Sequence, residues 1–366
     1  MASAPSNFVP PFCPNADCDF HLDSKGWRYK KDGHHYRQCD RRFVQRYRCT
    51  HCGRSYSSQT FSTSYWLKRP DLLLPILHGL LSCSAFRQIA RAQSVSPSTV
   101  ELHAARLGRH MLLFHEELRP KRAPAEPLVF DGFESFAYSQ YWPAHLNTVV
   151  GAISHFHYAT TVAELRRKGA RTAKQTLRRA VLEKEFGRPD PKEIEKSAAA
   201  ALALVVPEHS ALIVLRTDDH RAYPRALRRL KDRHFSQAIT SSKQARNSQN
   251  PLWPVNLLHS LMRHNGANHK RETIAWSKRA QSMVWRDALH RVWRNYVKHF
   301  SERRKDESPA MRLGLLKSRL HWPVILASRL FVTRVQLLSP LDEYYWGRIP
   351  TRQIPNARVH RLRFAY

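Results

Sequence analysis

Two short segments of the sequence carry the side chains best suited to chemistry. In one, the apolar run 212–215 is followed closely by Asp218, Asp219 and His220. In the other, an apolar approach over 128–130 ends at Asp131. A fully apolar run of this length is typical of a strand buried on both faces. Because open α/β sheets place their ligand sites just beyond such strands, the two acids indicate metal-dependent chemistry.

The charge balance of the chain indicates a polyanionic partner. The 366 residues include 61 Lys and Arg against 29 Asp and Glu, which gives a formal net charge of +32. A field of this sign favours nucleic acid, whose phosphates would contribute most of the binding free energy. The alternatives are a ribosome-type or a membrane-surface protein. No apolar stretch of about 18 residues occurs, and the N-terminus lacks the charged-then-apolar order of a signal peptide.

Four of the six cysteines stand in two pairs at metal-ligand spacing. They are Cys13, Cys18, Cys49 and Cys52. Four thiolates can form the tetrahedral site that a structural zinc ion requires, and unoxidised pairs of this kind indicate a reducing cytoplasm. Short basic strands are expected between the pairs, over 27–30 and 42–48. Two further residues are alternative ligands at less regular spacing, Cys39 and His51.

Residues 70–118 are expected to be helical, with a possible helix-turn-helix motif. Helices are predicted over 71–81, 84–92 and 98–109, and Ser96-Pro97 is a good cap and first-turn pair for the last of them. In this arrangement the final helix enters the major groove of duplex DNA. A plain pair of structural helices explains the same pattern. The residues expected to face solvent on the final helix are Ser98, Thr99, Glu101 and His103.

The second half of the chain alternates short apolar runs with helical segments. Three successive strands are expected over 127–138, 147–155 and 157–162, followed by a basic loop and helix over 165–182. The remaining expected elements are a helix over 192–206, a strand over 211–216, a helix over 221–230, a strand over 235–240 and a late helix over 280–299. This order, a three-strand meander followed by alternating helices and strands, is that of the ribonuclease-H-like fold.

Several motifs together resemble bacterial insertion-sequence transposases of the DDE type, in the class with an N-terminal zinc ribbon and a helix-turn-helix. The similar segments run from about Cys13 to Leu315, and they include FVQRYRCTHCGRSYS, VFDGFESF, LRTDDHRAYPRAL, NHKRETIAWSKRAQ, VWRNYVK and SPAMRLGL. The resemblance implies an enzyme that cuts and joins DNA strands with Mg²⁺ or Mn²⁺, beside a structural Zn²⁺. It further implies double-stranded DNA as partner, a homo-oligomer on that DNA, no membrane association and a bacterial cytoplasmic, nucleoid-associated location.

The same resemblance assigns roles to individual acids. Asp131 matches the first acid of the family and Asp218 the second, so both are expected to hold the catalytic cation. In many relatives the third ligand is a Glu at the position where this chain has Gln281, a poorer metal ligand. Glu272 and Asp287 are the local alternatives, and Glu272 is favoured because it lies in a polar run. The residues expected to contact DNA are Arg166, Arg167, Arg178, Arg179, Ser98 and Thr99.

The sequence thus predicts an α/β multidomain protein. The expected parts are a zinc ribbon (1–62), a helix-turn-helix domain (63–120), a ribonuclease-H-like catalytic domain (126–300) and a basic, helical C-terminal extension (301–366). Two rival functions remain at this point. The loss of the third acid would leave a catalytically inactive DNA-binding regulator, and the positive charge would also suit an RNA-processing nuclease or RNA-binding factor.

Overall fold

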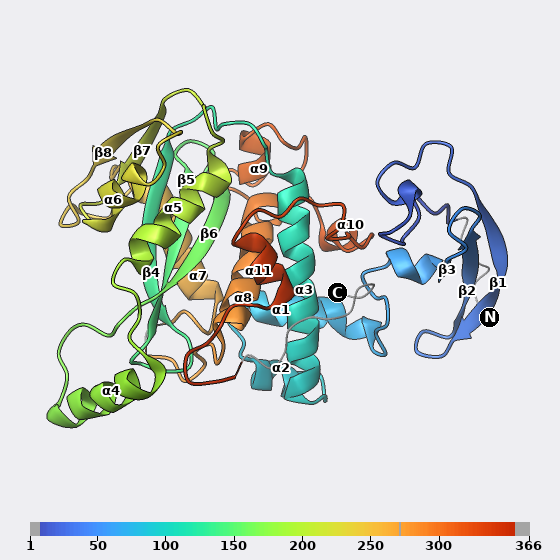
Figure 1. Cartoon of the computed structure of the whole chain (residues 1–366), viewed down its shortest axis with the longest axis horizontal. Coiled ribbons are helices and arrows are strands. Elements are labelled where there is room, and N and C mark those ends of the chain that lie inside the picture. The colour runs from blue at the N-terminus through green and yellow to red at the C-terminus, as the bar shows by residue number, and fades with distance from the viewer. Residues whose placement is uncertain (1–7, 271, 356–366) are drawn as a thin grey trace.

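The computed structural model describes residues 8–270 and 272–355, which form a small N-terminal module and a larger body (Figure 1). The N-terminal module, residues 8–62, is an antiparallel sheet of β1 (Tyr29–Arg37), β2 (Arg42–Cys49) and β3 (Ser55–Ser57), flanked by the 3-10 turns η1 (Asp19–His21) and η2 (Ser58–Phe61). Strand β2 agrees with the sequence prediction. Strand β1 is longer than the predicted strand because it pairs along the whole length of β2, from Tyr29–Cys49 to Arg37–Arg42.

Three helices lead from the module into the body. They are α1 (Leu73–Leu81), α2 (Phe86–Ala92) and α3 (Pro97–Leu118), with the 3-10 turn η3 (Pro70–Leu72) ahead of them. The Ser96 side chain caps α3 by accepting a hydrogen bond of 3.2 Å from the Thr99 amide, as the sequence predicts. Helix α3 continues past the predicted end at Arg109 because its later turns are buried, Met111 and Leu113 fully, in the core of the body.

The body is organised around a mixed sheet of five strands. The strands are β4 (Leu128–Phe136), β5 (Pro143–Gly151), β6 (His157–Glu164), β7 (Ile213–Thr217) and β8 (Phe235–Ile239). Their order is β6-β5-β4-β7-β8, with antiparallel pairs among the first three and parallel pairs joining β4, β7 and β8. The sheet therefore has the strand order of a ribonuclease-H-like core, as the meander and the later strands predict.

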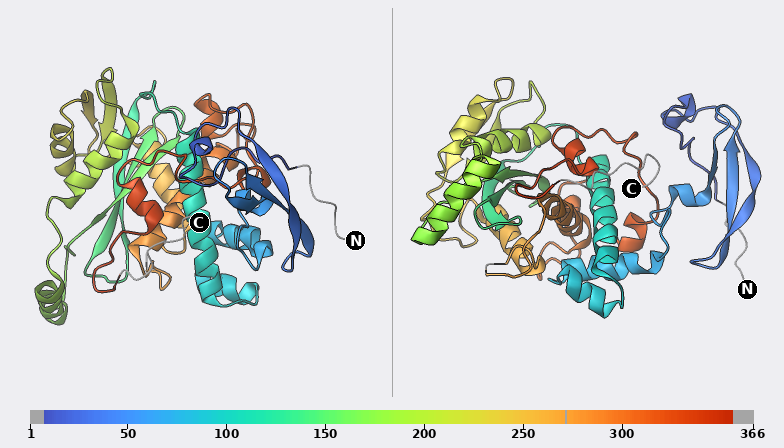
Figure 2. Two further views of the ribbon diagram at one scale, coloured as in Figure 1. Left: turned by 45° about the vertical axis from the view of Figure 1, so that its right-hand side comes forward. Right: turned by 60° about the horizontal axis from the view of Figure 1, so that its bottom comes forward.

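Helices cover both faces of the sheet. They are α4 (Ala173–Phe186), α5 (Glu193–Val205), α6 (Ala222–Arg228), α7 (Trp253–Asn265) and α8 (Ala280–Val292), which continues as one π-helical turn, η4 (Trp293–Val297). On one face, Leu128 and Phe130 of β4 share a core with α5 and α6. On the other, Val129 and Phe133 pack against Leu258 and its neighbours on α7. Helix α4 projects from this sandwich (Figures 1 and 2).

The C-terminal segment joins the two parts of the molecule. Its short helices α9 (Pro309–Arg312), α10 (Trp322–Ile325) and α11 (Leu341–Trp346) lie along the body. Between α10 and α11 the chain touches the N-terminal module: the Phe331 ring lies 5.3 Å from Phe12, and the Thr333 hydroxyl lies 2.7 Å from His21 Nε2. The described part of the extension is thus packed, whereas the basic run Arg358–Arg363 lies outside the described residues.

A single apolar core crosses the predicted boundary between the helical segment and the sheet domain. Leu107 and Met111 of α3 share that core with Leu289 of α8 and Phe130 of β4. Helices α1 to α3 are therefore built onto the body, with α3 lying along α8 (Figure 1). None of the helices within 8–270 and 272–355 has the length and apolar composition that crossing a membrane demands.

Candidate functional site

The register of two neighbouring strands brings Asp131 and Asp218 to the same level. Leu128 pairs with Leu215 in the parallel ladder between β4 and β7, and three further residues on each strand lead to Asp131 and Asp218. Both side chains also face the same side. Asp131 lies on the same face of β4 as Val129 and Phe133, which pack against α7. Ile213 and Leu215 of β7 are buried in the core on the other side, so by alternation Asp218 points to the α7 side as well. The two predicted acids therefore meet beneath α7.

A polar cavity of about 390 Å³ opens at this point of the sheet. Its lining comes from β4, from Asp218, from the loop that holds Arg246 and from one face of α7. The full set is Asp131, Gly132, Phe133, Glu134, Asp218, Arg246, Trp253, Asn256, His259, Ser260 and Arg263. Two carboxylates face guanidinium groups here, so the cavity can receive both a cation and a phosphate.

Asp131 is held by two hydrogen bonds, and its surroundings raise its pKa. Its Oδ1 accepts hydrogen bonds from the Gly132 amide at 2.7 Å and from the Tyr223 hydroxyl at 3.3 Å. Burial raises the pKa of Asp131 to about 7, and the charge of Asp218 adds to this rise. Hydrogen bonding and the charge of Arg246 act in the opposite direction. A divalent cation would relieve the repulsion between the two carboxylates, so this oxygen donor set fits a hard metal ion.

The neighbour Asp219 has a separate, structural role. Its Oδ2 accepts hydrogen bonds from the amide and the hydroxyl of Ser242, both at 3.2 Å. The Asp218 side chain instead accepts from the His220 amide at 3.0 Å and lines the cavity. The two adjacent acids therefore diverge, as strand alternation predicts.

A chain of hydrogen bonds links Asp131 to α7. Thr148 on β5 is the cross-strand partner of Asp131, and its hydroxyl donates to the Asp131 carbonyl oxygen at 2.9 Å. The same hydroxyl lies 2.7 Å from His259 Nε2. The other ring nitrogen, His259 Nδ1, lies 3.9 Å from Asp131 Oδ2. Burial lowers the pKa of His259 to about 3, so the imidazole is neutral.

The structure does not bring the three suggested third ligands to this cavity. Glu272 is exposed, and the segment that carries it runs along the far end of β4, where the Tyr138 amide donates to the Ser277 carbonyl at 2.8 Å. That point is seven residues beyond Asp131, about 23 Å along an extended strand. The preference for Glu272 therefore has no support in the geometry.

The two candidates on α8 have structural partners instead. Gln281 donates from Nε2 to the Tyr344 carbonyl at 2.6 Å. Asp287 is fully buried beside β6, where its Oδ2 accepts from Arg291 at 2.6 Å. Burial raises the pKa of Asp287, and the Arg291 charge opposes that rise. Helix α8 packs on α3, which draws both side chains away from the Asp131–Asp218 cavity.

Helix α7 forms one wall of this cavity and is absent from the sequence prediction. It carries Asn256, His259, Ser260 and Arg263 into the cavity. A signal for it was present: Pro254 stands in the first turn, and Val255, Leu258 and Met262 recur at helical spacing. The polar face between these apolar residues is the face that covers the two acids.

The second predicted site, the four-cysteine cluster, is complete in the structure. The Sγ atoms of Cys13, Cys18, Cys49 and Cys52 all lie within 4.8 Å of one another, which confirms that the two pairs converge. Trp27 donates from Nε1 to Cys49 Sγ at 3.2 Å. Burial raises the pKa of Cys49, but this hydrogen bond and those from nearby backbone amides outweigh it and lower the value to about 6. A stabilised thiolate among four sulfurs fits a tetrahedral zinc ion.

The basic residues of the segment 165–182 differ in their exposure and in how far acids of the same chain already pair with them. Arg166 pairs with Glu183 at 2.6 Å, and the largely buried Arg179 donates to the Arg167 carbonyl at 3.0 Å and lies 3.5 Å from the same Glu183. Arg178 is exposed on the projecting helix α4. Of the four predicted DNA contacts here, Arg166 and Arg179 are therefore partly neutralised within the protein.

Most of the exposed residues of α3 lie in its first turns, and Glu117 near its end is exposed as well. Ser98 is exposed and Thr99 is partly exposed, whereas His103 is 4% exposed. The expectation that His103 faces solvent is wrong, because its ring bonds the Thr99 carbonyl at 2.8 Å and the Arg69 carbonyl at 3.1 Å. This N-terminal end of the helix is the part that can reach a DNA groove with the predicted Ser98 and Thr99.

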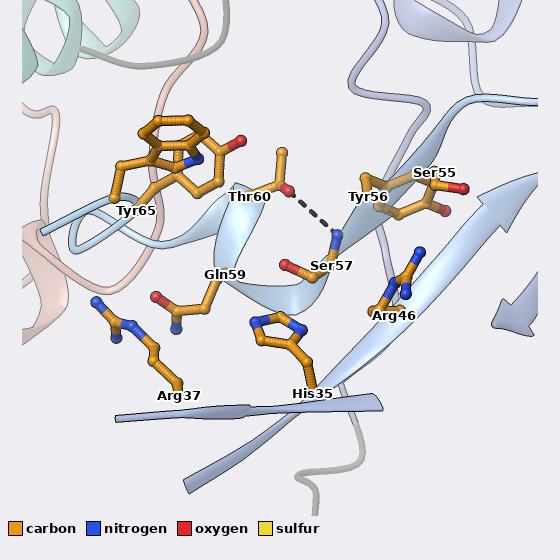
Figure 3. A pocket seen from close by; sticks show the side chains of 10 residues that line it. His35, Arg37, Arg46, Ser55, Tyr56, Ser57, Gln59, Thr60 and Tyr65 are labelled. Atoms are coloured by element: carbon orange, nitrogen blue, oxygen red, sulfur yellow. Dashed lines mark hydrogen bonds between the residues drawn. The ribbon is translucent and has the colours of Figure 1, made fainter. Parts of the chain in front are cut away.

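The N-terminal module has a polar pocket of its own, of about 380 Å³ (Figure 3). It lies between β1, β2 and the turn η2, and its lining includes His35, Arg46, Ser57 and the 75% exposed Trp66. Burial and the neighbouring guanidinium groups of Arg46 and Arg37 lower the pKa of His35. Positive charge beside an exposed aromatic ring suits a nucleic-acid backbone and its bases.

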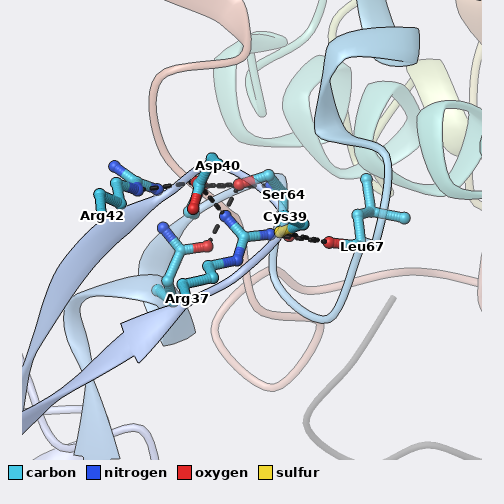
Figure 4. A network of polar contacts seen from close by, with 8 residues as sticks. Arg37, Cys39, Asp40, Arg42, Ser64 and Leu67 are labelled. Carbon is cyan, nitrogen blue, oxygen red and sulfur yellow. Dashed lines mark hydrogen bonds and ion pairs between the residues drawn. The ribbon is translucent and has the colours of Figure 1, made fainter. Parts of the chain in front are cut away.

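Arg37 fixes one wall of this pocket. Its guanidinium donates to Asp40 at 2.6 Å and to the carbonyls of Ser64 and Leu67 at 3.0 and 2.8 Å (Figure 4). These bonds clamp the strand β1 to the segment that carries Trp66. Arg46 has a weaker hold, a distance of 3.9 Å to Asp32, and remains the cation available to a ligand.

A comparison with protein-family models finds no match, and a comparison with curated proteins finds none either. Among solved structures, a chain of the cryo-EM structure of the simian T-cell lymphotropic virus intasome in complex with PP2A regulatory subunit B56 gamma is similar to this one. The match covers 68% of this chain and 74% of that chain, with 11% identity and a TM-score of 0.24. A TM-score this low does not support a fold assignment, which depends on the strand order of the sheet alone.

Proposed function

We propose that this chain is a DNA transposase of the DDE type. In this proposal a zinc-bound N-terminal module and the helix pair α2–α3 bind the ends of a mobile element, and the body cuts and joins the strands. One observation carries the proposal: two carboxylates, Asp131 and Asp218, stand at one level of adjacent parallel strands in a sheet with ribonuclease-H-like order.

The chemistry assigned to the cavity follows from its donors. Asp131 and Asp218 would hold Mg²⁺ or Mn²⁺, for which carboxylate oxygens are preferred ligands. When bound, the cation supplies Lewis-acid activation of an attacking oxygen and stabilises the leaving oxygen of a phosphodiester. The Tyr223 hydroxyl and the Gly132 amide orient the Asp131 carboxylate. Arg246 adds positive charge where a phosphate would enter.

Glycine at position 132 suits this arrangement. A Cβ atom there would lie 2.1 Å from His145 Cε1, so any side chain would push the His145 ring out of place or displace β4. The close approach lets the strand that carries Asp131 pack tightly on its neighbour. The Gly132 amide meanwhile stays 2.7 Å from the carboxylate that it orients.

DNA binding would involve three separate surfaces. The exposed first turn of α3 with Ser98 and Thr99 can reach base edges, because a recognition helix uses its N-terminal residues for this purpose. Arg178 on α4 and Arg46 on the N-terminal module can contact phosphates. Zinc would hold the module in shape, and we expect two or more copies to assemble on the paired element ends.

The proposal is tested with a DNA substrate taken from the flanks of the coding sequence. Inverted repeats there would identify the element ends, and a labelled duplex that carries one of them is incubated with the protein and Mg²⁺ or Mn²⁺. A cation-dependent nick at the repeat boundary with a free 3′-hydroxyl supports the transposase. Tight, sequence-specific binding without any nick supports the inactive regulator. Preference for RNA over duplex DNA at fixed salt would support the RNA-processing alternative.

A further inference from the structure

The cavity lacks a carboxylate at the place where a third metal ligand is needed. Glu134 is the remaining acid in its lining, but its side chain alternates to the face of β4 opposite Asp131, and its carbonyl oxygen accepts from Arg263. Helix α7 covers the two acids, and its side chains in the cavity are neutral or basic. On α7, His259 approaches Asp131, with Nδ1 at 3.9 Å from Oδ2.

One assignment of the hydrogen bonds around His259 leaves Nδ1 as the nitrogen without a hydrogen. The Thr148 hydroxyl has one hydrogen, and it donates this hydrogen to the Asp131 carbonyl. With that donor assignment, the same hydroxyl accepts from His259 Nε2 at 2.7 Å. Nε2 then carries the hydrogen, and Nδ1 presents its lone pair to the cavity. This pattern, with one nitrogen anchored to an oxygen and the other free, is typical of metal-binding histidines.

Two electron-pair donors consequently face each other across the gap between α7 and β4. His259 Nδ1 lies 3.9 Å from Asp131 Oδ2, which is too long for a hydrogen bond but close enough for both atoms to bind one cation at about 2.1 Å each. We propose that His259 Nδ1 is the third protein ligand of the divalent cation held by Asp131 and Asp218. The inference rests on the proposed function for the role of the cation. What it adds is the identity of the third protein ligand.

Binding requires a small closure of the site. Within the described ranges, the four cysteines are the only group of at least three His, Cys, Asp or Glu side chains whose ligand atoms all lie within 4.8 Å of one another. Asp131, Asp218 and His259 are spread more widely than this. Of the Asp218 oxygens, Oδ1 accepts from the His220 amide. Rotation of the Asp218 side chain is therefore the movement that we expect to close the site.

An imidazole ligand also predicts which cation is preferred. Carboxylates alone suit Mg²⁺, whereas a nitrogen ligand favours transition metals, along a series in which Mn²⁺ is the weakest binder. A site with two carboxylates and one imidazole should hence bind Mn²⁺ more tightly than Mg²⁺. Replacing His259 by Glu should restore an all-oxygen set and shift the preference back toward Mg²⁺.

The test measures metal binding to the full chain with its zinc in place and without DNA. Mn²⁺ is titrated, the free ion is counted by electron paramagnetic resonance, and pulsed spectra report nitrogen coupling to the bound ion. We expect nitrogen coupling in the wild type. His259→Ala should lose the coupling and weaken Mn²⁺ binding by about tenfold or more, because loss of even an outer-sphere partner costs roughly 10–100-fold. His259→Glu should recover affinity without recovering the coupling.

Matched variants decide between this ligand and its neighbours. His264→Ala removes an exposed imidazole from the same helix and should behave as the wild type. Coupling that survives in His259→Ala, or that disappears in His220→Ala instead, would overturn the assignment. Thermal melting checks the fold, and if the Ala variant is unfolded the Glu variant carries the comparison. If the wild type nicks DNA but shows no nitrogen coupling, the ligand assignment is overturned and the proposed function stands. If it shows nitrogen coupling but no nicking, the ligand assignment stands and the proposed function is overturned.

Discussion

The cysteine cluster of the N-terminal module and the Asp131–Asp218 cavity of the body are built in opposite ways. The cluster has four like ligands that already converge, and three of them are buried. The cavity has two carboxylates, an open volume of about 390 Å³ and arginines in its lining. Closed four-ligand sites are typical of structural metals, and open sites with exchangeable positions are typical of catalytic ones. The contrast indicates a structural role for the cysteine cluster and a chemical role for the Asp131–Asp218 cavity.

The largest expected effect concerns the closed site. Cys49→Ser should abolish zinc binding and unfold the N-terminal module, because structural zinc contributes on the order of 10 kcal/mol to the folding of such small units. Zinc content and limited proteolysis measure this, with cleavage expected inside residues 8–62 while the sheet of the body stays resistant. Cys39→Ser is the control, since Cys39 is exposed and outside the cluster. Zinc retained in Cys49→Ser, or lost in Cys39→Ser, would contradict the assignment.

A second prediction separates stability from catalysis among the suggested third acids. Asp287→Ala leaves Arg291 charged and buried, so the free energy of unfolding should fall by about 3–5 kcal/mol. Glu272→Ala removes an exposed acid and should change it by no more than about 0.5 kcal/mol. Chemical denaturation measures both. Substantial loss of cleavage in a stable Glu272→Ala protein would show that this loop closes onto the cavity in the complex with DNA.

The third prediction concerns α4. Arg178→Ala should weaken binding to all duplex sequences alike and reduce the salt dependence of the binding constant by about 0.9 in log–log slope, as expected for one lost phosphate contact. Arg179→Ala should mainly lower the melting temperature, because Arg179 is largely buried and bonds the Arg167 carbonyl. Binding isotherms at several salt concentrations provide the slopes. A loss confined to one DNA sequence would instead make α4 a base-reading element.

The smallest expected effect belongs to the pocket of the N-terminal module. Arg46→Ala should weaken DNA binding by a few-fold, since a contact of this kind contributes roughly 1 kcal/mol. Arg28→Ala removes the same charge from an exposed position of the module outside the pocket. Equal losses in the two variants would show that general charge is responsible, and that the pocket has no specific part.

The cysteine cluster and the two acids of the Asp131–Asp218 cavity could be predicted from the sequence. The cysteine pairs define their site by local spacing. Asp131 lies within a strand and Asp218 directly after one, and both strands have apolar runs that are evident in the sequence. The third ligand could not be found in this way. Its position depends on how α7 crosses β4, a contact between residues more than a hundred positions apart, and family resemblance directed attention to Gln281 on α8 instead. The prediction for His103 was wrong because the carbonyl of Arg69, 34 residues earlier, contacts its ring, and helical periodicity does not reveal that contact.

The central claim is that Asp131 and Asp218 form the catalytic centre, and one measurement tests it most directly. Cleavage of an element-end duplex in Mg²⁺ or Mn²⁺ is compared for the wild type, Asp218→Ala and Asp219→Ala. We predict that Asp218→Ala abolishes cleavage while DNA binding stays equal or becomes slightly tighter, because a negative charge near phosphate is removed. Asp219→Ala should still cleave, since Asp219 faces Ser242 and lies outside the cavity. Equal cleavage by the wild type and Asp218→Ala would contradict the account.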